Sequence, residues 1–147
     1  MTTPVTQLID RVQYLANNLD EIVIMVAESQ EDLFKQINQR QLFGGQDAKG
    51  EQITPSYTTG TVQIKRRKGQ PTDRVTLEDT GDFYDSIFVV AEGDKLYIAA
   101  SDDKLQKLVT KYGPDILGIA QENLGDVCQG IYDPLLDFIK KVIYDRQ

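Results

Sequence analysis

The side chains most able to do chemistry in this sequence are four carboxylates in one short stretch: Glu78, Asp79, Asp82 and Asp85. Paired carboxylates can act as general acid and base, or can hold a hard cation. Their spacing does not match the EF-hand calcium loop, because no bidentate glutamate stands where that loop would end. Aspartates beside a helix start also satisfy free backbone N–H groups. We interpret the group as capping and solvated side chains, with a metal site and a catalytic pair as the alternatives.

The second candidate site is a run of basic residues. Residues 65–74 hold five basic side chains and Asp73, a local charge of +4. The basic residues are Lys65, Arg66, Arg67, Lys68 and Arg74. Such a loop could touch the phosphates of a nucleic acid, meet an acidic face of a neighbouring copy, or stay solvated. The run contains no aromatic residue, which weakens its case as a stacking platform for single strands.

Two residue types are scarce, and their scarcity limits the chemistry. The chain has no His and one Cys, Cys128, so it cannot use an imidazole base and cannot form an internal disulfide. No phosphate-cradling glycine motif and no nucleophile elbow is present. Cys128 falls at helical spacing among apolar residues, and we expect it to be buried. The sequence therefore predicts no catalytic, cofactor-binding or metal-binding residues, no cofactor and no enzymatic activity.

Length and charge limit the partners. The chain has 147 residues, with 23 acidic and 16 basic side chains and a net charge of -7. This length predicts one domain over residues 1–147, and the acidic balance disfavours bulk binding to nucleic acid or to an anionic membrane. The N-terminus lacks the pattern of a signal peptide, and the longest apolar run, Ile22–Ala27, is too short for a bilayer. We expect a soluble protein of a reducing cytoplasm with no membrane partner.

The elements that position these residues begin with a helical segment over residues 4–43. Its apolar residues recur every three or four positions, with Thr3 as N-cap, Pro4 in the first turn and Gly44 as the stop. Such a helix would be longer than one small core can cover, so it either breaks near Asn17 and Asn18 or packs partly on another molecule. Residues 44–61, polar and rich in Gly, Gln and Thr, are predicted to be an extended loop.

The remainder, residues 62–147, predicts strands, short helices and a final helix. Thr61–Lys65 has the alternation of a strand, and residues 87–91 and 95–100 form a hairpin around a Gly-containing turn. The last segment has helical spacing, and Pro134 must either kink it or start a second helix capped by Asp133. The fold class is α+β: a long N-terminal helix, a small antiparallel sheet with a hairpin and a C-terminal amphipathic helix.

Several phrases in this order resemble a known family. Leu77-Glu78-Asp79-Thr80-Gly81-Asp82-Phe83-Tyr84-Asp85-Ser86-Ile87 matches L-x-x-T-G-x-L/F-x-x-S-I, and a Tyr-Gly turn and the phrase Ile116-Leu117-Gly118-Ile119 follow. The matching positions are Thr80, Gly81, Phe83, Ser86, Leu117 and Gly118. In this order they resemble the virion-morphogenesis, tail-completion and head–tail joining proteins of tailed phages. The family usually has a His near the Tyr-Gly turn and a Ser or Thr cap where this chain has Ala120.

The resemblance implies a non-enzymatic structural protein of the virion neck or tail, made in the bacterial host cytoplasm. It would form a ring of its own copies, contact portal, connector or tail-tube proteins, and touch DNA only in passing. Residues 65–74 have a local charge of +4, whereas the rest of the chain is acidic. This separation of charge favours contacts between two different faces of neighbouring copies. The alternative function is a nucleic-acid-binding accessory module that uses the basic residues of 65–74.

Overall fold

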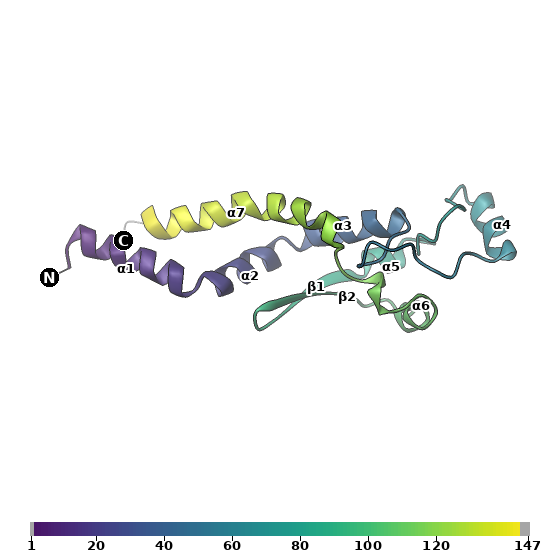
Figure 1. Cartoon of the computed structure of the whole chain (residues 1–147), viewed down its shortest axis with the longest axis horizontal. Helices are drawn as coiled ribbons and strands as arrows, with labels where there is room; N and C mark the ends of the chain where they lie inside the picture. The colour runs from purple at the N-terminus through teal and green to yellow at the C-terminus, as the bar shows by residue number, and fades with distance from the viewer. Residues whose placement is uncertain (1, 145–147) are drawn as a thin grey trace.

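The computed structural model describes residues 2–144 and confirms the predicted α+β class. The molecule is elongated, with a rod of helices at one end and a head at the other (Figure 1). The elements are α1 (Pro4–Asn17), α2 (Leu19–Ser29), α3 (Glu31–Phe43), α4 (Thr59–Arg67), α5 (Asp82–Asp85), β1 (Ile87–Glu92), β2 (Lys95–Ala100), α6 (Leu105–Tyr112) and α7 (Leu124–Tyr144). Short 3₁₀ turns at Pro114–Ile116 and Gln121–Asn123 connect α6 to α7.

The N-terminal helical segment is divided into α1, α2 and α3. The predicted start is confirmed, because Thr3 Oγ1 accepts a hydrogen bond from the Thr6 backbone N–H at 3.2 Å. The predicted break near Asn17 and Asn18 is also confirmed. Asn18 leaves helical geometry, and its side-chain amide donates to the Tyr14 carbonyl at 2.8 Å. A second break, at Gln30, was not predicted from the sequence.

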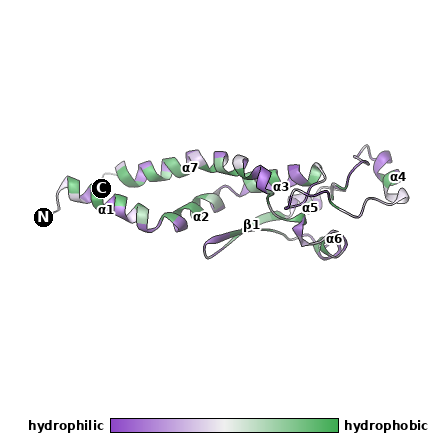
Figure 2. Cartoon of the chain, in the orientation of Figure 1, coloured by the Kyte–Doolittle hydropathy of each residue, from purple (hydrophilic) through white to green (hydrophobic). Residues whose placement is uncertain are grey.

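The rod consists of α1 and α2 packed against α7, which runs back antiparallel to them (Figure 1). Its buried residues are Leu15, Ile22 and Val26, and they pack on a stripe of apolar residues along α7. That stripe is Ile131, Leu135, Phe138, Ile139, Val142 and Ile143. Arg11 ties the far end of the rod together by donating to the Ile143 carbonyl at 2.8 Å. Hydrophobic and hydrophilic residues alternate along these helices, as the green and purple bands of Figure 2 show.

The head consists of residues 31–123 and has its own core. In the two-stranded antiparallel sheet, Ile87 is opposite Ala100 and Glu92 is opposite Lys95, so the predicted hairpin is confirmed. The core of the head contains buried residues of α3, α5, β1, the first 3₁₀ turn and the loops. These are Leu42, Ile53, Val75, Leu77, Phe83, Tyr84, Ile87 and Ile116.

The rod meets the head where α2 packs on β1 and β2 and where α7 packs on α3. A Cβ placed on Gly130 of α7 would lie 2.3 Å from Leu33 Cδ2, on α3. Real Cβ atoms do not come this near another heavy atom, so any larger residue at 130 would require Leu33 to move. Around this point Phe34, Ile37 and Val127 form a small core that joins the two regions.

The predicted strand at Thr61–Lys65 is wrong, because these residues lie within α4. The predicted loop 44–61 therefore ends at Thr58, whose Oγ1 accepts from the Thr61 N–H at 3.3 Å and caps the helix. In a short run of alternating polar and apolar residues, periodicity alone does not distinguish a strand from a helix. Here the cap at Thr58 favours the helix. The helix buries Lys65 and leaves Ile64 exposed, the reverse of what a strand on the core would do.

For the C-terminal helix, the structure excludes one of the two alternatives at Pro134 and corrects the prediction for Cys128. α7 continues through Pro134, so Asp133 does not start a second helix there. Cys128 is exposed rather than buried, because α7 is covered by the rest of the molecule along one face only. Val127 lies on that face and is buried, and the next residue along a helix points about 100° away.

No helix within residues 2–144 is both long enough and apolar enough to cross a bilayer.

Candidate functional site

The head contains a cleft of about 410 Å³ between α4, α6 and residues 77–81, which we call the α4–α6 cleft. Apolar and aromatic side chains of these segments and of the residues next to them line most of it. They include Tyr57, Ile64, Leu77, Phe83, Leu108 and Tyr112. Charged groups also line it: Lys65 and Lys68 at the end of α4, Glu78, Asp79 and Lys104. This volume falls within the range of roughly 300–1,000 Å³ in which proteins bind small groups.

The family-like motif forms one wall of the cleft, and local geometry explains its residues. Gly81 has a φ of +94°, a left-handed conformation that favours glycine, and it turns the chain into the single turn of α5. Phe83 is buried beneath that turn. Ser86 Oγ donates to the Phe83 carbonyl at 2.8 Å, just before β1 begins. Thr80 accepts a long hydrogen bond, 3.4 Å, from the Asp82 N–H.

The other two motif residues, Leu117 and Gly118, lie away from this cleft. Gly118 has a φ of +132°, and a Cβ there would lie 2.8 Å from Ala48 Cβ. Its N–H donates to Asn38 Oδ1 at 3.2 Å, and its carbonyl accepts from Gln41 Nε2 at 3.1 Å. Gln41 Oε1 also accepts from the Ala120 N–H at 2.8 Å. The motif thus contributes to two separate places in the head.

Asn38 and Gln41 of α3 were missed by the sequence reasoning. Both are buried, and their amides hold residues 116–120 by the bonds just described and by a weak bond, 3.4 Å, from Asn38 Nδ2 to the Ile116 carbonyl. The sequence does contain a pattern that indicates their burial. Both polar residues fall on the apolar side of an amphipathic helix, beside Ile37 and Leu42. Buried amides of this kind almost always have partners.

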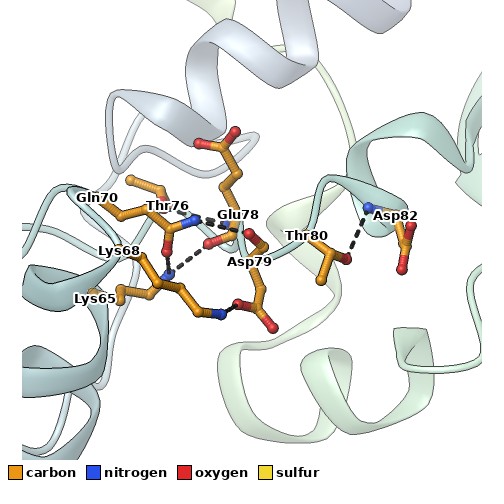
Figure 3. A network of polar contacts seen from close by, with 8 residues as sticks. All are labelled: Lys65, Lys68, Gln70, Thr76, Glu78, Asp79, Thr80 and Asp82. Atoms are coloured by element: carbon orange, nitrogen blue, oxygen red, sulfur yellow. Dashed lines mark hydrogen bonds and ion pairs between the residues drawn. The ribbon is translucent and has the colours of Figure 1, made fainter.

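Lys65 is the most deeply placed of the predicted basic residues. Its side chain is 8% exposed, and Nζ donates to the Glu78 carbonyl and to Gln70 Oε1 at 3.3 Å. The ammonium also lies 5.0 Å from the centre of the Tyr57 ring, close enough for a cation–π interaction. Figure 3 shows these bonds joining the end of α4 to residues 78–79. The role of Lys65 is therefore to hold the cleft in shape.

Lys68 and Asp79 form an ion pair at the cleft opening (Figure 3). The hydrogen bond from Lys68 lowers the pKa of the Asp79 carboxyl, and the positive charges of Lys104 and Lys65 lower it further. Gln70 Nε2 donates to the Asp79 carbonyl at 2.8 Å and fixes the backbone there. Asp79 is thus held as a carboxylate among lysines.

The remaining predicted basic residues do not join this network. Arg66 and Arg67 are exposed on α4, and neither has a carboxylate partner among residues 2–144. Arg74 lies at another place, where Nε donates to the Phe43 carbonyl at 2.7 Å and the guanidinium lies 5.2 Å from the centre of the Phe43 ring. The structure therefore brings Lys65 and Lys68 to the cleft with Thr80, Gly81 and Phe83, but not Arg74.

Both helices beside the cleft are basic. Residues 59–68 contain Lys65, Arg66, Arg67 and Lys68, residues 104–112 contain Lys104, Lys107 and Lys111, and neither stretch has an acidic residue. The sequence reasoning missed the second group, although its spacing of three and four was a visible helical signal. The opposite charge gathers in the rod and the start of α3: residues 12–34 contain Asp20, Glu21, Glu28, Glu31 and Asp32 and no basic residue.

The carboxylates of residues 78–85 do not gather into a metal site. Across residues 2–144, no three His, Cys, Asp or Glu side chains lie close enough together to hold an ion. Asp79 is paired with Lys68, while Asp82 and Asp85 are exposed at the turn of α5. An apolar floor with lysines at its edge suits an apolar group flanked by carboxylates.

A second surface lies on the rod. Val5, Leu8, Ile9 and Val12 follow the i, i+3, i+4, i+7 pattern along α1, and each is at least 45% exposed. This pattern places them on one face of the helix. We call them the α1 stripe. A continuous apolar stripe that stays exposed among residues 2–144 is typical of a contact surface.

Comparisons of the chain with protein-family models, curated proteins and solved structures found no match. The functional inference therefore rests on the molecule's own surfaces and on the order of its motifs.

Proposed function

We propose that this protein is a structural subunit of a tailed-phage virion that assembles into a ring at the neck or the end of the tail. The observation that carries the proposal is the α1 stripe, whose Val5 is 64% exposed and Ile9 55%. The family-like order of motifs, from residues 77–87 to residues 116–119, supports the virion assignment.

The α1 stripe supports self-association on physical grounds. Burying an aliphatic side chain contributes about 1.5–3 kcal/mol relative to leaving it in water. Within residues 2–144, α7 packs on one side of α1 (Figure 1) and the four stripe residues stay 45–64% exposed, so part of this contribution is unused in a single copy. The charge of α1 does not oppose close packing, because Asp10 and Arg11 balance within residues 4–17.

The uneven charge supports a ring rather than a symmetric pair. Contacts between two different faces repeat from copy to copy and close into a ring when the rotation allows. This chain has two such faces. One is the stretch of residues 12–34, which has acidic but no basic side chains, and the other is formed by the basic helices beside the α4–α6 cleft. In the proposed setting, the other surfaces of the ring meet portal, connector or tail-tube proteins.

The test is the mass of the purified full chain in solution as a function of concentration, followed by images of virions. We expect a discrete oligomer, and we expect the double variant Val5→Ser, Ile9→Ser to shift the chain toward monomer. Tyr132→Ser is the control, because Tyr132 is 63% exposed on α7 outside the stripe. A chain that stays monomeric at all concentrations and is absent from particles would contradict the proposal.

The second candidate function, a nucleic-acid-binding accessory module, is favoured by one observation. The two stretches beside the cleft carry seven cations and no anion. Phosphate binding of this kind weakens steeply as salt rises, because condensed counterions are released. Binding of a labelled DNA oligonucleotide that falls with salt, and falls further in Arg66→Glu, would favour it. No binding at low salt would remove it.

A further inference from the structure

We propose that the α4–α6 cleft of one copy receives the outer face of α2 from the next copy. This inference rests on the proposed function, since it names the two surfaces through which copies associate. The structure contributes three observations: the outer face of α2, the chemistry of the cleft, and the separation of the two within one chain.

The outer face of α2 presents an apolar residue between two carboxylates. Glu21, Met25 and Glu28 have the spacing i, i+4, i+7, which places them on one side of the helix. Met25 is 46% exposed, whereas Ile22 and Val26 face α7 and are buried. Methionine is flexible and adapts to irregular apolar pockets. The outer face of α2 therefore presents a thioether between two carboxylates.

The cleft presents the complementary order. Its floor is apolar, with Ile64, Leu77 and Leu108 among its residues, and Lys104 stands at its edge. Of the seven cations in the flanking stretches, 59–68 and 104–112, Lys65 is buried and Lys68 is paired with Asp79, so five are exposed without a carboxylate partner within residues 2–144. Residues 12–34 bring five anions. With Met25 over the apolar floor, Glu21 and Glu28 would lie toward the two basic helices. Complementary potentials of this kind steer association and fix its orientation.

Two copies are required for this contact. α4 lies at the far end of the head, whereas α2 lies in the rod beside α7 (Figure 1). One chain cannot place its own α2 in its own cleft without leaving this fold. Because the two surfaces differ, each copy uses both, and the contact repeats along the assembly.

The experiment reverses charge on each surface separately. The cleft variant combines Lys104→Glu, in the lining of the cleft, with Arg67→Glu, on α4 beside the cleft and outside its lining; both residues are exposed and have no carboxylate partner within residues 2–144. The face variant is Glu21→Lys with Glu28→Lys. Lys95→Glu, at the exposed end of β2, is the matched control for a change of charge away from both surfaces. All are made in the full chain, and circular dichroism confirms that each is folded.

Sedimentation of the variants, alone and mixed, measures how strongly the copies associate. We expect the apparent dissociation constant to rise at least tenfold for the cleft variant alone and for the face variant alone. A one-to-one mixture should associate again, because each copy then meets a surface of opposite charge. Lys95→Glu should behave as the unmodified chain. In a separate arm, Met25→Ser should weaken association, and Tyr132→Ser should not.

The contrary outcomes are distinct. If the unmodified chain associates and both charge variants associate equally well, this inference is overturned while the proposed function stands. If the unmodified chain is monomeric and absent from particles, both are overturned. If the cleft variant loses salt-dependent binding to a DNA oligonucleotide and the mixture does not restore association, the cleft binds nucleic acid and the inference is also overturned.

Discussion

The head and the rod bury their apolar residues to different degrees. In the head, Leu42 and Ile116 are completely buried, and the hairpin, α3 and the loops surround them. In the rod, Leu15, Ile22 and Val26 are buried along one line between two layers of helix. The residues next to that line, such as Leu8 and Val12, remain about half exposed.

The difference indicates which region depends on partners. A core enclosed on all sides gains its stabilisation within one chain, whereas a helix pair leaves half of each apolar face in water. The head also satisfies its buried amides, since within residues 2–144 no buried side-chain nitrogen or oxygen lacks a hydrogen bond. We therefore expect substitutions in the head to change folding, and substitutions on the rod surface to change association.

The largest effect is expected at Ile116, in the middle of the head core. Ile116→Ala should lower the free energy of unfolding by about 2–5 kcal/mol, because a cavity replaces fully buried methyl and methylene groups. Urea denaturation followed by circular dichroism measures it. An equal loss from Leu8→Ala in the rod would contradict the contrast between the two regions.

The next effect is expected at Gln41. Gln41→Ala removes the acceptor of the Ala120 N–H and the Asn123 side-chain amide. Leaving buried groups without a partner costs about 1–3 kcal/mol. Gln36→Ala, an exposed position on the same helix, is the control and should be nearly neutral. Hydrogen exchange of the Ala120 amide should quicken in Gln41→Ala alone.

A smaller effect is expected at Asp79. Its folded pKa lies below the ordinary value of 3.8 because of Lys68, so its contribution is complete above that value and is lost as the pH falls through the lower folded pKa. Both partners are about half exposed, so Asp79→Asn should cost under about 1 kcal/mol at neutral pH. Unfolding measured from pH 7 to pH 2 should show the difference between Asp79→Asn and the unmodified chain vanish. A difference that grew toward low pH would have the wrong sign.

The smallest effect on folding is expected on the α1 stripe. Val5→Ser with Ile9→Ser should change the unfolding free energy of the monomer by no more than about 0.5 kcal/mol, as exposed substitutions usually do. The measurement is made at protein concentrations below those at which copies associate. A large loss of monomer stability would mean that the stripe is part of the rod's own core.

Much of the fold was predictable from local signals. Thr3 and Pro4 begin α1, Gly44 follows the end of α3, and Gly93 turns the hairpin, each for a reason confined to a few residues. The α4 region was not predictable in this way. Val62 and Ile64 alternate as a strand would, and the Thr58 cap competes with that pattern.

The candidate site was only partly predictable because it depends on distant residues meeting. Lys65 and Lys68 were identified by their charge, and Thr80, Gly81 and Phe83 by the motif, but nothing local indicates that they share a cleft with Lys104 and Leu108. Cys128 was misplaced for a similar reason. Helical spacing identifies an apolar face, but its width depends on how many neighbours cover the helix.

Gly130 sets how closely α7 approaches α3 at the junction of the rod and the head. Because α7 touches Leu33 with no Cβ between them, the absence of one methyl group contributes to the direction in which the rod leaves the head, together with the packing of α2 on β1 and β2. The rod acts as a lever from that point, so a slight tilt at Gly130 becomes a larger displacement at Val5. The curvature of any assembly that uses both ends would therefore change with this one residue, even though Gly130 itself lies in neither contact.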